Sequence, residues 1–296
     1  VLVAVVEAGS FVGAASRLGA SPPAITRAVA SLEGRLGVRL LVRTTRALRL
    51  TDAGQRFVDH TRRLLGEIDA AERDALGETG EPSGHLTLTA SLTFGRMVLA
   101  PIVTAFLAAH PKVTASVGLH DRVVDLLDEG IDVAVRIAEL PDSSLVARRV
   151  GEVRRLLVAG PDYLARCGAP ESPTQLKAHA VIAFTGLMPG HEWRYVADGR
   201  TRAVAITPRL EINDALAALA AAEAGEGITP ALSYMTADAV AAGRLVPVLE
   251  DWSPAPVPIH LVHQQGRLVP QKIRAFMDFA APRLTAGLGN LAKVAD

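Results

Sequence analysis

Hydroxyl and guanidinium groups gather near the start of the chain in a pattern that suits contact with DNA. The candidate DNA-binding residues lie in two short stretches, and two prolines accompany the polar side chains of the first. They are Ser21, Pro22, Pro23, Thr26 and Arg27, and then Arg43, Thr44, Thr45, Arg46 and Arg49. Hydroxyl and guanidinium groups donate hydrogen bonds to phosphate oxygens, and Arg also contacts base edges in the major groove. The alternative for the first five is an ordinary surface helix that is poor in charge.

The distribution of charge supports binding of a polyanion. The formal net charge of the 296 residues is zero, but residues 1–63 hold ten Arg against four acids, and residues 64–81 hold six acids against one Arg. A basic N-terminal part followed by a nearly neutral remainder is typical of a nucleic-acid-binding module, because phosphate neutralisation supplies most nonspecific affinity.

The first stretch must be presented by a helix. Pro22 and Pro23 suit the first turn, where N–H groups have no intrahelical partner, and Ser21 can cap that turn. Ile25, Val29, Leu32 and Leu36 form one apolar stripe, which leaves a small, polar face with Arg27 on the other side.

Neighbouring segments complete a helix-turn-helix motif. A helix capped by Ser10 is expected over Phe11–Leu18, before a break at Gly19. After Gly37, the run "LLVRTTRALRLT" predicts a short two-stranded wing along the phosphates.

A long helix should follow, beginning at Thr51. Phe57, Thr61, Leu64, Ile68, Ala71 and Ala75 recur at alternating spacings of four and three, so we expect this helix to pair with another helix. The alternative is a core helix of a single domain. The run "GETGEPSGH" predicts a linker at its end.

The remaining residues alternate between strand and helix patterns, which predicts an α/β architecture. "HLTLTAS", "TASVGLH" and "IDVAVRI" are expected to be strands, and "DRVVDLLDEG" a helix between the last two. "VADGRTRAV" predicts an antiparallel hairpin with an Asp-Gly turn, and further helices are expected at Asp214–Ala224, Ser233–Ala242 and Pro270–Leu284.

Ligands of open α/β folds lie beyond the C-terminal ends of strands, where the next helix begins. Arg136 could pair there with a carboxylate or instead anchor to Glu139 or Asp142, and Asp214 could cap a helix instead. The run "GEGITP" around Gly225 and Gly227 could bind a phosphate, or it could instead close a helix and open a strand. The candidates at these ends are Ser91, Leu92, Thr93, Arg136, Phe184, Thr185, Asn213, Asp214, Gly227 and Ile228.

Motifs for catalysis are absent from the sequence, which contains no G-x-S-x-G, P-loop, H-E-x-x-H or G-x-G-x-x-G. We therefore expect no catalytic residues, no cofactor and no metal site. His260 and His263 are a poor metal pair because they point to opposite faces of a predicted strand, and Cys167 is the one cysteine. No signal peptide is recognisable, and the longest uncharged apolar run contains Pro101, so we expect a cytoplasmic protein without a membrane partner. A few residues are expected before Val1, because the chain lacks an initiator Met.

Several of these segments together resemble one known family. "EAGSFVGAASRLGASPPAITRAVASLEGRLGVRLLVRTTRALRLTDAG" is similar, almost position for position, to the N-terminal domain of LysR-type transcriptional regulators. "FLAAHPKV", "DVAVRIAELPDSSLVARRV" and "GRLVPVL" resemble the rest of that family. Leu2 and Leu41 stand where the family commonly has Phe, and Thr26 where Ser is commoner.

The resemblance implies an α+β multidomain fold with three parts. These are a winged helix-turn-helix over residues 1–51, a linker helix and hinge over 52–81, and an effector-binding domain over 82–296 that is similar to periplasmic binding proteins. Its lobe one is expected at 85–159 and 259–296, and its lobe two at 160–258, with crossings near Ala159–Gly160 and Pro258.

The resemblance also implies the partners. They are double-stranded DNA at a promoter or operator, a small effector between the lobes, and copies of the same chain, as a homodimer through the linker helix and a homotetramer. The groups at the strand ends suit an anionic or carbonyl-bearing effector. The alternative functions are a solute-binding protein and an enzyme carrying a DNA-binding head.

Overall fold

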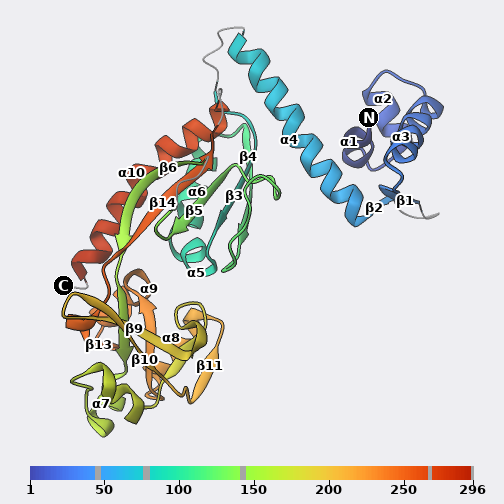
Figure 1. Cartoon of the computed structure of the whole chain (residues 1–296). Helices are drawn as coiled ribbons and strands as arrows, with labels where there is room; N and C mark the ends of the chain where they lie inside the picture. Colours follow the sequence, from blue (N-terminus) through green and yellow to red (C-terminus); the bar gives the residue numbers. More distant parts are fainter. Residues whose placement is uncertain (44–47, 76–80, 141–144, 266–268, 295–296) are drawn as a thin grey trace. The chain divides into compact units, whose positions relative to one another are not determined.

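The chain is divided between two compact units, Val1–His85 and Leu86–Asp296. They are seen in a computed structural model that describes residues 1–43, 48–75, 81–140, 145–265 and 269–294. The first unit contains short helices, a small hairpin and one long helix, and the second contains mixed strands and helices (Figure 1).

Three helices form the core of the first unit, namely α1 (Leu2–Glu7), α2 (Phe11–Arg17) and α3 (Pro22–Leu36). Ser10 begins α2 as predicted, because its hydroxyl oxygen accepts a hydrogen bond from the N–H of Gly13 at 3.0 Å. Gly37 has a φ of 68° just after α3, which is the left-handed conformation that commonly ends a helix.

The apolar stripe of α3 is only partly buried. Ile25 and Val29 are 3 % and 1 % exposed within the core of the first unit, and Leu32 packs against that core. Leu36, the last residue of the predicted stripe, is 41 % exposed. The helix ends at this residue.

The predicted wing has the strands β1 (Leu41–Arg43) and β2 (Leu48–Leu50), which pair antiparallel with Leu41 opposite Leu50. The long helix α4 (Asp52–Ala75) follows directly. Thr51 begins it, because its hydroxyl oxygen accepts a hydrogen bond from the Gly54 N–H at 2.9 Å. A Cβ at Gly54 would lie 1.9 Å from the Leu40 carbonyl oxygen, so only glycine allows the helix to start so close to the wing.

The second unit is built on a five-stranded sheet in the order β4-β3-β5-β14-β6. The strands are β3 (Gly84–Ala90), β4 (Val113–Leu119), β5 (Val133–Ile137), β6 (Leu145–Val153) and β14 (Val257–Gln264). Strands β3 and β5 are parallel, whereas β14 is antiparallel to both β5 and β6.

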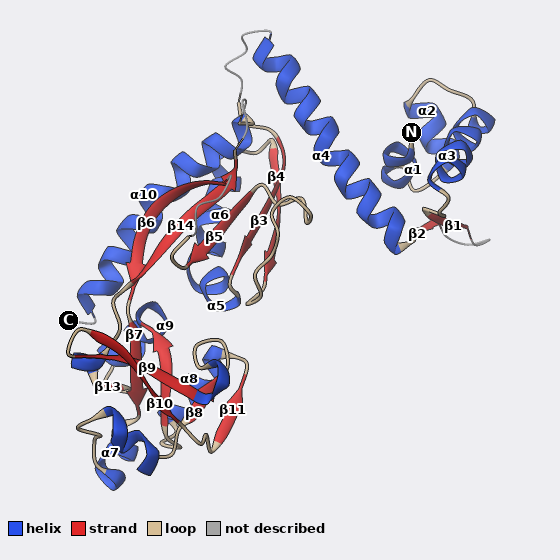
Figure 2. Cartoon of the chain, in the orientation of Figure 1, coloured by secondary structure: helices blue, strands red, loops and turns tan. Residues whose placement is uncertain are grey.

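Two helical segments pack on this sheet, and Figure 2 shows the long α10 beside β6 and β14. One is the continuous run of α5 (Leu92–Phe94), a π-helical segment (Gly95–Leu99) and α6 (Ala100–Ala109). The other is α10 (Gln271–Val294), which is longer than the predicted Pro270–Leu284. Lys272 fixes its first turn, because its Nζ lies 2.8 Å from a carboxylate oxygen of Asp132.

The run Leu92–Ala109 is long and apolar enough, by length and composition, to cross a membrane. Phe94, Leu99, Val103 and Phe106 of this run are nevertheless buried among the core residues of the five-stranded sheet. The packing is that of a core helix.

A second group of strands lies between β6 and β14 in the sequence. A three-stranded sheet has the order β12-β7-β13, and two further pairs are β8 with β11 and β9 with β10. The strands are β7 (Arg155–Ala159), β8 (Ile182–Phe184), β9 (Glu192–Ala197), β10 (Arg200–Ala205), β11 (Leu210–Ile212), β12 (Ile228–Leu232) and β13 (Val246–Val248). The accompanying α-helices are α7 (Pro161–Cys167), α8 (Ala215–Glu223) and α9 (Ser233–Ala241), and 3₁₀ turns span Pro173–Ala178, Pro189–His191 and Glu250–Trp252.

The chain passes from the five-stranded sheet to the three-stranded sheet at Arg154 and returns before Val257. The first passage differs from the predicted crossing near Ala159–Gly160, because the apolar run of β7 pairs with β12 and β13 instead of extending the first sheet. Val257 and Val153 are opposite each other in the β14–β6 pair, so both passages occur at the same end of that sheet.

The helix predicted over Asp121–Gly130 is wrong, since this segment is a loop with one turn. Val124 and Leu126 are buried, whereas Val123 and Leu127 are 86 % and 61 % exposed. The Asp125 carboxylate accepts hydrogen bonds from the N–H groups of Leu127 and Asp128 at 2.7 and 3.1 Å. Such a local side-chain turn competes with helix formation and accounts for the difference.

Candidate DNA-binding surface and effector site

The start of α3 presents most of the predicted DNA-binding residues to solvent. Ser21, Pro22, Pro23 and Arg27 are exposed, and Thr26 is half-buried. Ser21 occupies the N-cap position, but its hydroxyl makes no hydrogen bond to the helix, contrary to the expected cap. Its carbonyl oxygen accepts from the N–H groups of α3 instead. The start of α3 therefore carries an exposed hydroxyl at its N-cap and an exposed guanidinium in its second turn.

The single acid of α3 is turned away from this exposed face. Glu33 Oε1 accepts hydrogen bonds from the backbone N–H groups of Leu40 and Leu41, at 2.7 and 3.0 Å. These bonds fix the start of the wing against α3. They also leave the outer face of the helix without a carboxylate that would repel phosphates.

Cations of the first unit differ in whether a carboxylate neutralises them. Arg17 and Arg62 both contact Glu7, at 2.8 and 3.7 Å. Within the described part of the chain, Arg27 and Arg49 have no ion pair. These two remain available to an external anion.

The wing is only partly described. Arg49 is exposed on β2, opposite Val42, and the backbone of Arg43 lies opposite Leu48. The side chain of Arg43 and the residues Thr44, Thr45 and Arg46 lie outside the described residues.

The predicted apolar stripe of α4 divides into two parts. Phe57 packs against the core of the first unit, and Thr61 donates its hydroxyl hydrogen to the Phe57 carbonyl at 2.7 Å. Leu64 and Ile68, further along, are both 53 % exposed. The side chains of Ala71 and Ala75 lie outside the described residues. Leu64 and Ile68 are therefore apolar residues of α4 that their own unit leaves largely uncovered, as is the neighbouring Leu65, which is 47 % exposed.

In the second unit, the helix that starts after Ser91 already holds an internal carboxylate. Asp121 Oδ1 accepts a hydrogen bond from the Leu92 N–H at 3.0 Å. Thr93, next along, is 5 % exposed. The positive end of this helix is therefore partly neutralised by the protein itself.

Tyr234 of α9 brings an unpaired hydroxyl to the same place. Its ring packs edge-to-face against Phe94, with ring centres 5.2 Å apart. Its hydroxyl oxygen lies near Ser91 but is buried without a hydrogen-bond partner at normal geometry, among the described residues. Burial is the main factor that raises the pKa of Tyr234 well above its usual value, and the nearby Asp121 adds to it. This hydroxyl is therefore neutral and keeps its proton, which it can donate in a hydrogen bond.

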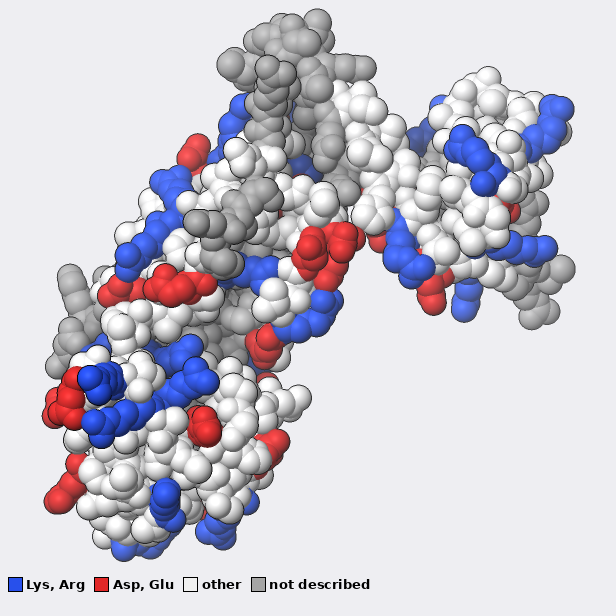
Figure 3. All heavy atoms as spheres, viewed as in Figure 1, with Lys and Arg blue, Asp and Glu red and all other residues white. Residues whose placement is uncertain are grey.

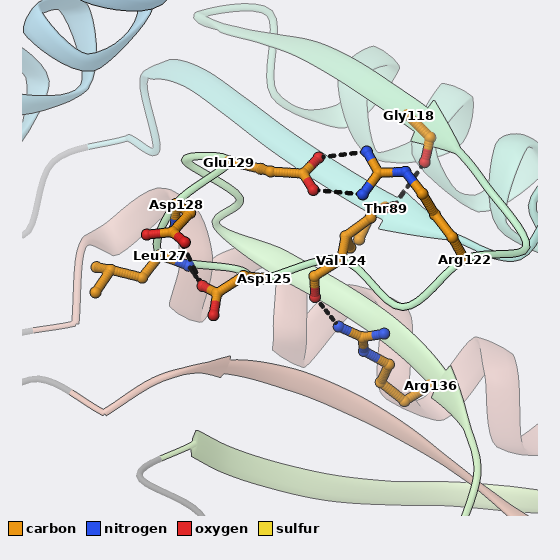
Figure 4. Close-up of polar contacts among 9 residues, drawn as sticks. All are labelled: Thr89, Gly118, Arg122, Val124, Asp125, Leu127, Asp128, Glu129 and Arg136. Carbon is orange, nitrogen blue, oxygen red and sulfur yellow. Dashed lines mark hydrogen bonds and ion pairs between the residues drawn. The ribbon is translucent and has the colours of Figure 1, made fainter.

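Arg136 is bound within the protein. Its guanidinium donates a hydrogen bond to the Val124 carbonyl, which belongs to the loop where a helix had been expected (Figure 4). In the same loop, Arg122 and Glu129 form a two-bonded ion pair at 2.7 and 3.0 Å. The hydrogen bonds of this pair raise the pKa of Arg122 and lower that of Glu129.

Asp214, among the other predicted effector residues, caps α8, because its carboxylate accepts from the Ala217 N–H at 2.8 Å. The neighbouring Asn213 is exposed. Thr185 is half-buried, and its N–H donates to the Ile212 carbonyl at 3.0 Å.

Three more of these residues contribute to packing. Phe184 is 4 % exposed in a core cluster, and Ile228 is fully buried. Gly227 has a φ of 156°, and a Cβ there would lie 2.4 Å from the Ala180 carbonyl oxygen. Of the ten candidates, Ser91 lies near the Tyr234 hydroxyl, and Leu92 and Thr93 follow it directly in the chain.

Comparison with known proteins decides the family. A model of the bacterial regulatory helix-turn-helix of the lysR family matches residues 1–55, and one of the LysR substrate binding domain matches residues 79–285. The chain belongs to the LysR-type transcriptional regulators. A LysR-type regulator is a DNA-binding transcriptional regulator with an effector-binding domain, so the predicted family and function are confirmed.

Relatives of this LysR-type regulator match it over nearly its whole length. An HTH-type transcriptional regulator of Xanthomonas campestris pv. campestris (strain 8004) is 36 % identical over 289 residues, 96 % of this chain and 84 % of the relative. The regulator CrgA of Neisseria meningitidis serogroup C (strain 8013) is 33 % identical over 291 residues, 98 % of this chain and 96 % of CrgA. These relatives are transcriptional regulators and not enzymes.

Solved structures agree with the fold. CrgA from Neisseria meningitidis matches with a TM-score of 0.63 and 31 % identity, over 95 % of this chain and 96 % of CrgA. AphB, the Vibrio cholerae virulence activator, matches with a TM-score of 0.60 and 29 % identity, over 94 % and 96 % of the two chains. Both comparisons include the helix-turn-helix and the effector-binding domain.

Three residues that matter here, Glu33, Asp121 and Tyr234, were not singled out from the sequence. Glu33 accepts hydrogen bonds from residues seven and eight positions further along the chain. The sequence feature that could have indicated its role is that it is the one acid of α3. Asp121 and Tyr234 meet Leu92 and Ser91 only in the folded unit, and nothing in their local sequence indicates it.

Proposed function

We propose that this regulator binds operator DNA through the first turns of α3 and through the wing, and that an effector in the second unit controls this binding. The observation that supports this proposal is the exposed face of α3. Arg27 has no ion pair there among the described residues, and Glu33 accepts hydrogen bonds from the start of the wing. Thr26 and Arg27 would contact base edges or phosphates, and Arg43, Arg46 and Arg49 would contact phosphates.

The test is DNA affinity, measured on a fragment that the protein selects from random sequences. Arg27→Ala should weaken binding to the selected DNA by about 1–3 kcal/mol if Arg27 contacts a base. Arg17→Ala is the matched control, because it removes the same charge from a side chain already paired with Glu7 at 2.8 Å. Equal losses in the two variants would contradict the proposed role of α3.

The wing should behave differently in the same titrations. Arg49→Ala should weaken selected and random DNA alike and lower the salt dependence by about one unit of slope, as expected for a lost phosphate contact. A loss confined to the selected sequence would show a base contact instead.

We infer that the effector is a small carbonyl-bearing molecule held near Ser91, Thr93 and Tyr234. The buried Tyr234 hydroxyl can donate to a carbonyl oxygen. Asp121 already accepts from the Leu92 N–H, and its negative charge would oppose a second anion there. Of the two predicted effector classes, the carbonyl-bearing one is therefore better supported than the anionic one.

Assembly through α4 completes the proposal. Leu64 and Ile68 are exposed on a helix with an apolar heptad stripe, which supports pairing of two α4 helices into a homodimer. The family resemblance implies that two such dimers assemble into a homotetramer. The two α3 helices of a dimer would then contact two half-sites in the cytoplasm.

A further inference from the structure

A pocket of about 250 Å³ lies in the second unit and is lined by none of the residues that the sequence assigns to the effector site. Strands β7, β9 and β12 and the loop after Thr185 form its walls. We call it the arginine pocket and define it by Arg155, Leu187, Pro189, Glu192, Arg194 and Pro230.

The two arginines that line the arginine pocket lack a partner among the residues that the structure describes. Within the described parts of the chain, neither Arg155 nor Arg194 makes an ion pair or a side-chain hydrogen bond. Arg202, on the same β9–β10 hairpin, is by contrast 2.9 Å from an Asp198 oxygen. Figure 3 shows Lys and Arg atoms gathered over this part of the second unit. An unneutralised pair of guanidinium groups at one pocket is suited to an anion.

The register of β9 places the charges on one face. Trp193 and Tyr195 are buried and stack with their ring centres 5.6 Å apart, so Glu192 and Arg194 lie on the opposite, exposed face of the strand. With Arg155, these groups give the arginine pocket a net charge of +1. A ligand with a single negative charge matches this balance better than a dianion, which Glu192 would repel.

The remaining wall is apolar and fixed in place. Leu187 and Met188 donate their N–H groups to the Phe184 carbonyl at 3.0 and 2.9 Å, which holds the loop over β8. A Cβ at Gly186 would lie 2.6 Å from the Phe184 ring, so a larger residue there would require this buried ring or the loop to shift. Leu187, Pro189 and Pro230 then present a preformed apolar surface to a ligand.

We propose that the arginine pocket binds a small monocarboxylate with an apolar body, at a site separate from Ser91 and Tyr234. The carboxylate would accept hydrogen bonds from Arg155 and Arg194, and the apolar body would cover Leu187, Pro189 and Pro230. The regulator would thus have two ligand sites that differ in chemistry. One would donate a hydrogen bond to a carbonyl oxygen of its ligand, and the other would bind a carboxylate.

Three probes separate charge from apolar contact. Cyclohexanecarboxylate carries both features, cyclohexanecarboxamide lacks the charge, and acetate lacks the apolar body. Ligand-detected NMR titration of the full chain should show that cyclohexanecarboxylate binds about ten-fold or more tightly than either of the others. No binding of cyclohexanecarboxylate, or equal binding of the amide, would overturn the proposal.

Variants locate the bound probe. Arg194→Ala should weaken cyclohexanecarboxylate binding by about ten-fold or more, because a charge-assisted bond is lost. Arg200→Ala is the matched control, since Arg200 is exposed on the same hairpin and does not line the arginine pocket. Equal affinity in the two variants would refute the assignment.

A further variant distinguishes this site from the proposed effector site. Thr93→Val should bind cyclohexanecarboxylate as tightly as the wild type. If Thr93→Val loses the probe and Arg194→Ala keeps it, the probe binds near Tyr234 and the arginine pocket is not its site. The DNA titrations of Arg27→Ala stand apart from these outcomes, so either proposal can fail alone.

Discussion

Tyr234 is notable because its buried hydroxyl has no normal hydrogen-bond partner among the described residues. A buried hydroxyl left unpaired costs about 1–3 kcal/mol of stability. Tyr234 belongs to a helix of the second strand group but packs within the core of the five-stranded sheet. A polar group kept there at a cost in stability is explained if a ligand uses it.

Tyr234→Phe tests this explanation, because it removes only the hydroxyl. We expect the free energy of unfolding, measured by urea denaturation, to stay the same or rise by about 1 kcal/mol, while the DNA-binding response to the effector is lost. Tyr163→Phe is the control. The Tyr163 hydroxyl lies 3.1 Å from His179 Nδ1 and accepts from the Ala180 N–H at 2.9 Å, so its loss should destabilise the protein. Similar destabilisation in both variants would mean that the Tyr234 hydroxyl is already bonded.

At the scale of elements, the first turns of α4 pack against the core of their own unit, whereas apolar residues further along the helix are exposed. Val58 is fully buried and Phe57 packs against the same core, whereas Leu64 and Ile68 are exposed. A helix of this length gains most of its stability from packing, so the exposed part needs a partner.

Ile68→Asp should therefore dissociate the proposed dimer, because it would place a charge in an apolar helix pair. Gly66→Asp is a matched control that adds the same charge on the opposite face of α4, where a side chain would meet nothing within 4 Å. Light scattering should give a smaller particle for Ile68→Asp alone, with weaker binding to a two-half-site DNA fragment. An unchanged mass for Ile68→Asp would exclude α4 as the dimer contact.

Sequence patterns were sufficient for elements whose determinants are local. Ser10 and Thr51 cap the helices that they were expected to cap, and the Asp198-Gly199 turn joins β9 to β10. The same patterns failed over Asp121–Gly130, where apolar residues at helical spacing are divided between a buried and an exposed set by the Asp125 turn.

The candidate sites depended on contacts that spacing does not reveal. Arg136 is bound by the Val124 carbonyl, twelve residues away, and Asp121 reaches the Leu92 N–H across 29 residues. The arginine pocket unites strands that are separated by long stretches of chain, and its unpaired charges become visible only when their neighbours are known. The family could be predicted from the sequence, whereas the contacts around the candidate effector residues required the folded unit.

At the scale of the whole molecule, the second unit contains one group of strands placed between two strands of another sheet. Residues 154–256 leave after Val153 and return at Val257, and these two valines are opposite each other in the β6–β14 pair. Leu232 and Tyr234 are buried residues that the second group contributes to the core of the five-stranded sheet, and Leu187 and Met235 pack against the same core.

Because its two ends are neighbours, the segment 154–256 has the geometry of an inserted domain that could be removed by protein engineering. Joining Val153 to Val257 through an Asn-Gly turn would convert β6 and β14 into one continuous hairpin. We expect the shortened chain of residues 86–153 and 257–294 to fold with a single cooperative thermal transition, at a lower Tm because it lacks Leu232 and Tyr234. Circular dichroism would follow this transition, and a chain without cooperative melting would show that the five-stranded sheet depends on its insertion to fold.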